Sequence, residues 1–225
     1  MTAIYDITKF TMLDYPDEIA CIAWFAGCNM RCPYCYNPKI VRGKGTLKVE
    51  ELMAFLKKRQ GLLDGIVLSG GECTNYPHLS ELCKQIKQLD YLIKIDTNGS
   101  RPDVLESLFQ QKQIDYVALD FKTTENKYSG LTGLKDGYEL FSKSLALCIL
   151  HKVTHEVRVT IHSDLLTCED LAEMIGDLER MGYKGKLYCQ NFIESDNLGD
   201  LESSSKSVDF SKLDQHKIEL RNFDI

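Results

Sequence analysis

This sequence of 225 residues lacks both an excess of basic residues and any long apolar run. Lys and Arg number 27 against 33 Asp and Glu, which gives a formal net charge of −6 at pH 7. A nucleic-acid-binding protein that relies on a basic surface would show the opposite balance. No stretch of about 18 or more apolar residues occurs, so we expect no membrane-spanning helix.

The sequence also lacks features that would divide the chain or direct it out of the cell. It has no repeats, no low-complexity segment and no linker rich in proline or glycine. No charged-then-apolar signal segment opens it, so we expect a cytoplasmic protein whose thiols stay reduced. Nine cysteines, an odd number, also argue against a disulfide framework.

Three of the cysteines, Cys28, Cys32 and Cys35, lie close together in the spacing C-x3-C-x2-C. Structural zinc normally takes four protein ligands, and no second C-x2-C or H-x3-H cluster follows. A cubane iron–sulfur cluster normally takes four Cys thiolates, so three local cysteines would leave one iron free to bind a small molecule. A zinc-binding interaction module that uses the triplet and a distant ligand stays open as an alternative.

Strands and helices alternate along the rest of the chain. Apolar residues at i, i+3, i+4 and i+7 predict helices, as at Val49, Leu52, Met53 and Leu56. Thr167, with Asp170 three residues on, can cap a further helix. Six buried strands are predicted at 19–25, 66–69, 91–95, 116–121, 156–161 and 186–192.

This alternation predicts right-handed βαβ units in a parallel sheet. Six strands are too few for the closed eight-stranded barrel. We therefore predict an α/β fold, an open partial (β/α)6 barrel over residues 1–192. A carboxyl-terminal tail of uncertain structure, residues 193–225, is expected to pack on this core.

Polar motifs follow the predicted strands at the ends where parallel α/β folds collect binding groups. They are Ser69-Gly70-Gly71-Glu72, Lys94-Ile95-Asp96-Thr97-Asn98-Gly99 and Ala118-Leu119-Asp120-Phe121-Lys122. Paired glycines let a ligand approach the backbone, and a carboxylate can accept hydrogen bonds from an ammonium group. Each motif alone is also a common turn or an accident of composition. Arg158 is either a site residue or a solvated residue of a strand edge.

Together with the cysteine triplet, these motifs resemble the radical S-adenosylmethionine (SAM) superfamily. The resemblance implies that Cys28, Cys32 and Cys35 hold a 4Fe-4S cluster whose open iron is chelated by SAM. Tyr34, just before the third cysteine, fits the usual form of that signature. Ser69, Gly70, Gly71 and Glu72 resemble the family's GGE motif, which holds the amino group of the methionine moiety.

Similarity to pyruvate formate-lyase activase implies further roles. Its segments matching Asp96-Thr97-Asn98-Gly99 and Asp120-Phe121-Lys122 line the SAM site. By this resemblance Asp96, Thr97, Asp120 and the carbonyl of Ala118 would hold a monovalent cation, and Lys122 would bring positive charge. Arg158 stands where that family has a catalytic-site arginine.

Two positions are left open by this resemblance. The activase's adenine-side histidine has no counterpart in 188–192, where Gln190 or Asn191 could hydrogen-bond instead, and His162 is expected at the surface or in a loop. Cys73 follows the GGE motif as a fourth ligand, a redox-active thiol or a packed bystander, and we expect the last.

The runs 10–16 and 25–38 resemble the activating proteins of anaerobic ribonucleoside-triphosphate reductase, with Asp17 in place of glycine and Tyr36 in place of histidine. The resemblance implies an oxidoreductase that cleaves SAM to a 5′-deoxyadenosyl radical and generates a glycyl radical on that reductase. It also implies a flavodoxin- or ferredoxin-type electron donor and no nucleic-acid or membrane partner. The enzyme alternatives are an activase of another glycyl-radical enzyme, such as pyruvate formate-lyase, and 7-carboxy-7-deazaguanine synthase.

Overall fold

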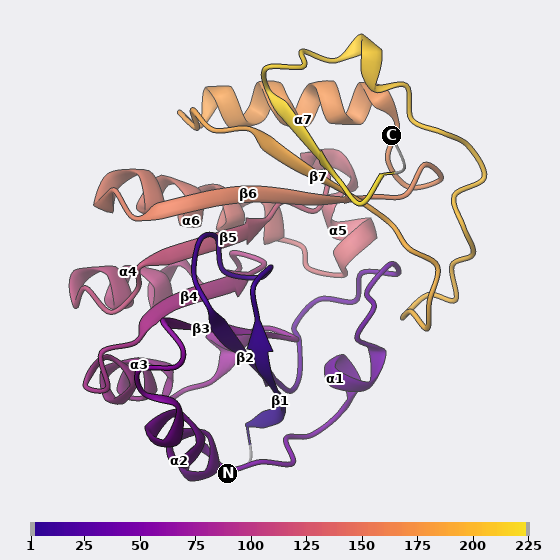
Figure 1. Cartoon of the computed structure of the whole chain (residues 1–225). Coiled ribbons are helices and arrows are strands. Elements are labelled where there is room, and N and C mark those ends of the chain that lie inside the picture. Colours follow the sequence, from indigo (N-terminus) through magenta and orange to yellow (C-terminus); the bar gives the residue numbers. More distant parts are fainter. Residues whose placement is uncertain (1–2, 224–225) are drawn as a thin grey trace.

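The computed structural model describes residues 3–223, which form one open sheet with helices along its outer face (Figure 1). β1 runs antiparallel to β2, and every later neighbouring pair is parallel. Within the described residues β1 and β8 are the two free edges. The strands follow sequence order as β1 (Ile4–Thr11), β2 (Ala20–Phe25), β3 (Gly65–Gly70), β4 (Leu92–Thr97), β5 (Tyr116–Asp120), β6 (Thr154–Ile161), β7 (Leu187–Asn191) and β8 (Ile218–Arg221).

Helices connect the parallel strands β2–β7, as the alternating pattern predicted. The Thr167 cap is confirmed: Thr167 Oγ1 accepts from the Asp170 amide at 3.2 Å, and Asp170 Oδ2 accepts from the Thr167 amide at 2.8 Å. The helices are α1 (Pro38–Arg42), α2 (Val49–Arg59), α3 (Leu79–Lys87), α4 (Pro102–Gln110), α5 (Glu125–Thr132), α6 (Gly137–His151) and α7 (Cys168–Arg180), with short 3-10 turns η1 (Cys73–Asn75) and η2 (Phe210–Lys212).

The predicted open parallel α/β sheet is confirmed, and its six predicted strands correspond to β2–β7. The structure adds β1 and β8, which the sequence pattern did not reveal. Strand β8 has only four residues, and its extended conformation is fixed by pairing with β7. Leu187 lies opposite Ile218, and Gln190 lies opposite Arg221. Part of the segment 193–225 is therefore an edge strand of the same sheet.

Apolar residues close the inner face of the sheet near the amino ends of the strands. Tyr15, Ala20, Ile22 and Val67 form a small cluster there, separate from the main core under the helices. The carboxyl ends of the strands are left to polar side chains. The fold thus puts its apolar filling and its polar groups at opposite ends of the same face.

The loop between β1 and β2 explains one departure from the family pattern. Asp17, which stands where that pattern has glycine, has a φ of 64° in the left-handed region. Asp and Asn adopt this conformation more easily than other residues with a side chain. Asp17 can therefore adopt at this position the left-handed conformation that glycine adopts most easily.

None of the helices that the structure describes has the length and apolar character needed to span a bilayer.

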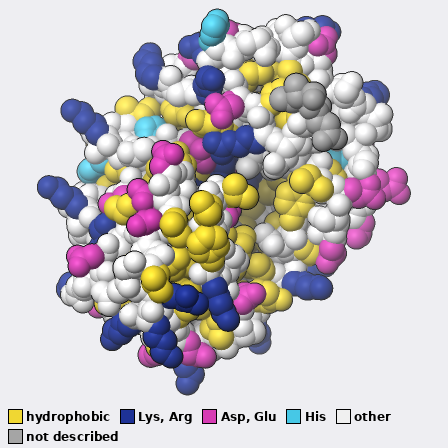
Figure 2. Space-filling view, viewed as in Figure 1, with side chains coloured by type: hydrophobic (Ala, Val, Ile, Leu, Met, Phe, Trp, Pro, Cys, Tyr) yellow, Lys and Arg dark blue, Asp and Glu magenta, His cyan; other side chains and the backbone are white. Residues whose placement is uncertain are grey.

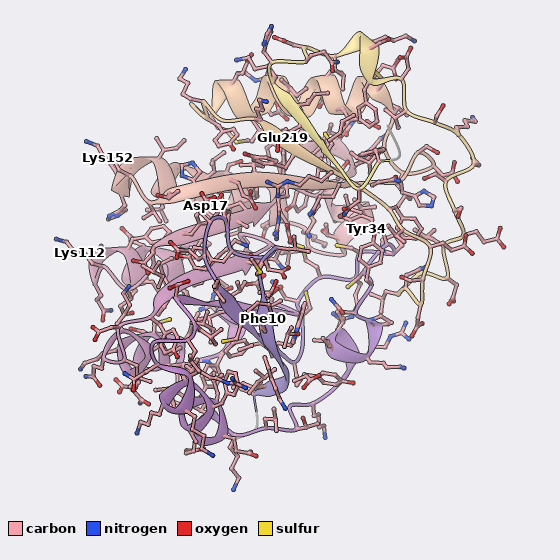
Figure 3. All side chains as sticks on the ribbon, in the orientation of Figure 1. Phe10, Asp17, Tyr34, Lys112, Lys152 and Glu219 are labelled. Carbon is pink, nitrogen blue, oxygen red and sulfur yellow. The ribbon has the colours of Figure 1, made fainter. Side chains whose placement is uncertain are left out.

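Two helices end at a lysine in the left-handed conformation: Lys112 follows α4 with a φ of 52°, and Lys152 follows α6 with a φ of 54° (Figure 3). This conformation costs a residue with a Cβ about 1 kcal/mol. We expect Lys152→Gly to raise the free energy of unfolding by about 1 kcal/mol in urea titrations. Ala146→Gly, at an exposed position inside α6, is the matched control and should lower it by about 1 kcal/mol. An equal loss in both variants would contradict the backbone argument.

Candidate active site

The carboxyl ends of the strands surround a cavity of about 340 Å³, where parallel sheets commonly bind ligands. One wall is the cysteine loop, which we define as residues 26–37 between β2 and α1. Of the predicted site residues, Ala118 alone does not line the cavity; it is fully buried in β5. The lining residues among the predicted set are Cys28, Cys32, Tyr34, Cys35, Ser69, Gly70, Gly71, Glu72, Asp96, Thr97, Asn98, Asp120, Lys122 and Arg158.

The three cysteines of the loop are free and face this cavity. Cys32 is buried, while Cys28 and Cys35 are half-buried. The Met30 amide donates to Cys28 Sγ at 3.3 Å, and Arg31 fixes the loop through hydrogen bonds to the carbonyls of Cys28 and Met30 at 2.6 and 2.7 Å. Burial raises the pKa of Cys28 to about 11. A bound cation would therefore be needed to keep this thiol ionised at neutral pH.

The arrangement of donors fits a cluster better than a single ion. Within residues 3–223, no three His, Cys, Asp or Glu side chains are grouped closely enough to hold one metal ion. A cubane makes no such demand, because its cysteine ligands bind different irons. Three free thiols on the wall of one cavity satisfy that requirement, and the zinc alternative gains no ligand set from the described residues.

Glu72 is 2 % exposed, and hydrogen bonds fix both of its carboxylate oxygens. Oε1 accepts from the Thr74 amide at 3.1 Å, the Thr74 hydroxyl at 2.5 Å and the Thr97 hydroxyl at 2.8 Å. Oε2 accepts from the Asn98 amide at 2.8 Å. Burial raises the pKa of Glu72, while these hydrogen bonds oppose the rise. Among the described residues, Oε2 accepts only this one hydrogen bond and keeps acceptor capacity for a cationic donor.

Gly70 and Gly71 are required by packing against the cysteine loop. Sequence reasoning explained the pair by ligand approach, but a Cβ on Gly71 would collide with the carbonyl oxygen of Gly27. A Cβ on Gly70, whose φ is 117°, would collide with the backbone of Phe25. The Gly71 amide donates to the Phe25 carbonyl at 2.8 Å, and the Glu72 amide to the Gly27 carbonyl at 2.9 Å. These contacts attach Glu72 to the loop that carries the cysteines.

Charged side chains from three neighbouring strands form the floor of the cavity. Arg158 on β6 contacts Asp120 on β5 at 2.9 Å and Asp96 on β4 at 3.6 Å. Lys122 lies 3.2 Å from Asp120, and Lys94 lies 2.5 Å from Asp96. The side chain of Arg158 is only 14 % exposed, so it is not a solvated residue of a strand edge.

Mutual pairing keeps Asp120, Lys122 and Arg158 ionised despite burial. Burial favours the neutral form of Asp120, but the cations of Arg158 and Lys122 hold its pKa below the ordinary value. Burial likewise opposes the charges of Lys122 and Arg158, yet Asp120 raises the pKa of both. The floor therefore presents fixed charges to any bound ligand.

The structure also decides the residues that sequence reasoning left open. Gln190 and Asn191 both line the cavity. His162 is in a loop as expected but is buried, because its Nε2 contacts the Glu202 carbonyl at 2.9 Å and its ring packs edge-on against Phe192. Cys73 is fully buried and lies outside the cavity lining, as expected for a packed bystander.

Sequence reasoning missed part of the cavity wall. Asp14, Trp24, Tyr36, Thr160, Ile193 and Asn222 also line it. The last two of these in the sequence, Ile193 and Asn222, come from the segment after β7, which carried no recognisable motif. Only the folded sheet brings that segment back to the cavity.

The segment after β7 also covers the cysteine loop directly. The Leu198 amide donates to the Cys35 carbonyl at 3.1 Å, and the Gly199 amide donates to the Pro33 carbonyl at 2.8 Å. A side chain at position 199 would collide with Pro33. Tyr36, which was expected to stand in place of a histidine, accepts a hydrogen bond from the Ile193 amide at 2.9 Å. The cysteine loop is thus held from both sides.

Residues 22–178 match the family model of the Radical SAM superfamily. A protein of Methanocaldococcus jannaschii, provisionally named as a glycyl-radical enzyme activating enzyme, is 36% identical over 177 residues, which are 75% of this chain and 72% of the relative. The pyruvate formate-lyase-activating enzyme of Clostridium pasteurianum is 32% identical over 154 residues, 64% of this chain and 63% of that protein. The 7-carboxy-7-deazaguanine synthase of Haemophilus influenzae is 32% identical over 101 residues, 44% of this chain and 42% of that protein.

Among solved structures, Streptococcus suis SuiB bound to S-adenosylmethionine superposes with a TM-score of 0.63 at 15% sequence identity. The match covers 81% of this chain and 44% of SuiB, so the chain spans less than half the length of that protein. At this identity the likeness concerns the fold.

Gly71→Ala tests the attachment of Glu72 to the cysteine loop. The added methyl group must push the Gly27 carbonyl away, so we expect a loss of roughly 2 kcal/mol in stability and faster alkylation of Cys28. Thermal unfolding and timed thiol labelling measure these effects. Gly130→Ala in α5 is the control, because no atom lies within 4 Å of the added Cβ. Unchanged labelling of the Gly71 variant would contradict the packing role.

Asp120→Asn tests the paired floor. The folded-state pKa of Asp120 is depressed, so its ionised form stabilises the protein above the unfolded pKa, and this contribution is lost as the pH falls through the folded pKa. We expect the variant to be about 2 kcal/mol less stable at pH 7. The difference in stability between the variant and the wild type should become smaller below about pH 4. A difference that is constant from pH 7 to pH 2 would argue against the ion pairs.

Proposed function

Because the chain belongs to the radical SAM superfamily, we propose that it is an activase that generates a glycyl radical on anaerobic ribonucleoside-triphosphate reductase. One observation carries the cofactor chemistry of this proposal: three free cysteines face the same cavity as the hydrogen-bonded carboxylate of Glu72 and the charged floor. Similarity to a glycyl-radical enzyme activating enzyme and to a pyruvate formate-lyase-activating enzyme supports the activase class.

The family implies a 4Fe-4S cluster and SAM, and the residues present fit both. Cys28, Cys32 and Cys35 would hold the cluster. Together with SAM, the bound cluster supplies the one-electron chemistry that cleaves the sulfonium. Glu72 would accept a hydrogen bond from the amino group of SAM, and Lys122 would face its carboxylate.

The remaining residues of the cavity would orient SAM and exclude water. Tyr34, Ser69, Gly70, Gly71, Thr97 and Asn98 line the same cavity and would contact SAM. Gln190 and Asn191 would replace the adenine-side histidine as hydrogen-bonding groups. Arg158 would act as the catalytic-site arginine by keeping the two floor carboxylates in place.

The monovalent cation near Asp96, Thr97, Ala118 and Asp120 stays a prediction. Ala118 does lie beside Asp96 in the neighbouring strand. The two carboxylates, however, already contact three cationic groups, those of Lys94, Lys122 and Arg158. An added cation would have to displace one of them.

Exposed apolar residues beside the cavity support a macromolecular partner. Phe10, Met12 and Leu13 are exposed next to Asp14, which lines the cavity, and exposed Ile193 lines it as well. Figure 2 shows hydrophobic side chains gathered over the β1–β2 hairpin. Contiguous exposed apolar surface of this kind often binds another protein. A flavodoxin- or ferredoxin-type electron donor and a cytoplasmic location are also part of the proposal.

The choice of reductase rests on the runs 10–16 and 25–38. An activase of pyruvate formate-lyase or of another glycyl-radical enzyme, and 7-carboxy-7-deazaguanine synthase, are compatible with the same cavity. The experiment that separates them incubates the reconstituted protein anaerobically with SAM, a reductant and each candidate partner or substrate in turn. Electron paramagnetic resonance then detects a glycyl radical, and chromatography detects 5′-deoxyadenosine.

We expect a glycyl radical with the anaerobic reductase alone. Cys32→Ala should lose the brown colour of the cluster, the formation of 5′-deoxyadenosine and the glycyl radical, because one ligand is gone. Cys168→Ala removes a half-buried thiol outside the cavity and should leave all three unchanged. Cofactor cleavage without a glycyl radical on any glycyl-radical protein would favour a small-molecule substrate. A colourless wild-type protein that binds zinc would contradict the proposal.

A further inference from the structure

Arg221 lies on the edge strand β8, outside every motif that the sequence revealed, yet the charged network extends to it. Its Nη2 contacts Glu156 Oε2 at 3.0 Å. Glu156, on β6, is 4 % exposed and lies two residues before Arg158 on the same face of the strand. The other oxygen of Glu156 is 3.9 Å from Arg158 Nη1. Glu156 therefore stands between the two arginines.

The side chain of Arg221 crosses the intervening strand β7 by stacking on an aromatic ring of that strand. The guanidinium of Arg221 lies 3.8 Å from the centre of the Tyr188 ring on β7. Tyr188 is directly opposite Arg158 in the β6–β7 register, and Gln190, two residues further along β7, is opposite Arg221 in the β7–β8 register. Stacking on an aromatic face is a favourable contact for a guanidinium and fixes its direction. Arg221 can therefore reach Glu156 on β6 from β8.

Arg158 has three carboxylates within 4 Å, and their distances are unequal. Asp120 is nearest at 2.9 Å, Asp96 follows at 3.6 Å, and Glu156 is the most distant at 3.9 Å. A buried carboxylate needs a paired cation, because the loss of hydration is not otherwise compensated. With Arg221 in place, Glu156 has that cation, and Arg158 is free to serve the cavity carboxylates. Without Arg221, Glu156 would compete for Arg158.

We propose that Arg221 is a positioning residue, which neutralises Glu156 and thereby holds Arg158 on Asp120 and Asp96 in the floor of the cavity. The position of the Arg158 side chain can be measured in the protein without cofactor, so this part of the proposal does not depend on the proposed function. The consequence for SAM binding rests on the proposed function. The edge strand β8 thus acts on the cavity from two strands away.

The test is a double-mutant cycle between Arg221 and Glu156. Arg221→Met leaves Glu156 charged and unpaired, Glu156→Gln removes the charge that would attract Arg158, and the double variant removes both. The double variant also keeps the test informative if the unpaired carboxylate prevents Arg221→Met from folding. Two quantities are measured: the solvent exchange of the Arg158 Nε–H proton by NMR in cofactor-free protein, and SAM affinity after cluster reconstitution.

We expect Arg221→Met to speed exchange of the Arg158 Nε–H proton, which Asp120 accepts at 3.0 Å in the wild type. SAM should bind on the order of tenfold more weakly, the size expected for coupled contacts. Glu156→Gln and the double variant should resemble the wild type in both measurements. Arg221→Lys should be intermediate, since it keeps the charge but not the stacked fork. An Arg158→Lys sample assigns the NMR signal.

Lys217→Met is the matched control. Lys217 directly precedes β8 and contacts Glu179 at 2.9 Å, but that pair is exposed and neither residue lines the cavity. The loss of Lys217 should change neither the exchange of the Arg158 Nε–H proton nor the affinity for SAM. If Arg221→Met leaves the exchange unchanged, or if the double variant is as impaired as Arg221→Met, Arg221 only anchors β8 and the positioning role is wrong. Altered exchange in cofactor-free protein together with no SAM binding by the reconstituted wild type would instead refute the proposed function and keep the positioning role.

Discussion

The contact of Arg158 with Asp120 and Asp96 is the interaction on which the site depends. Three parallel strands end side by side, and each brings a charged group that would be costly to bury alone. The guanidinium offers several donors in a fixed plane, so one side chain can serve carboxylates on two neighbouring strands. Lys94 and Lys122 complete the pairing. The result is a set of fixed charges at the bottom of the cavity.

Close backbone packing joins this floor to the cysteines. Gly70 and Gly71 let β3 and its following turn lie directly against Phe25 and Gly27, so Glu72 and the cysteine loop share hydrogen bonds. Glu72 is in turn held by Thr97 and the Asn98 amide at the end of β4. The positions of the three cysteines and of the Glu72 carboxylate are therefore not independent. A change in one loop is transmitted to the other through short backbone contacts.

The segment after β7 adds a second layer of control. It lies outside the matched residues 22–178, yet its backbone bonds to the cysteine loop at Pro33 and Cys35. Its last strand brings Arg221 to Glu156, and the next residue, Asn222, reaches the cavity wall. The cavity is thus enclosed in part by a segment of the chain that the family model does not cover.

The sequence alone determined the superfamily, its recognisable motifs and the order of strands β2–β7. Cys28, Cys32 and Cys35 are neighbours in the chain, and the polar motifs directly follow apolar strands, so local spacing and periodicity were enough to find them. The tertiary structure alone decided which charges pair, why Gly71 must be glycine, and that His162 is buried. It also decided that four residues near the carboxyl terminus complete the sheet. These features depend on contacts between residues far apart in sequence, for which a chain read locally contains no signal.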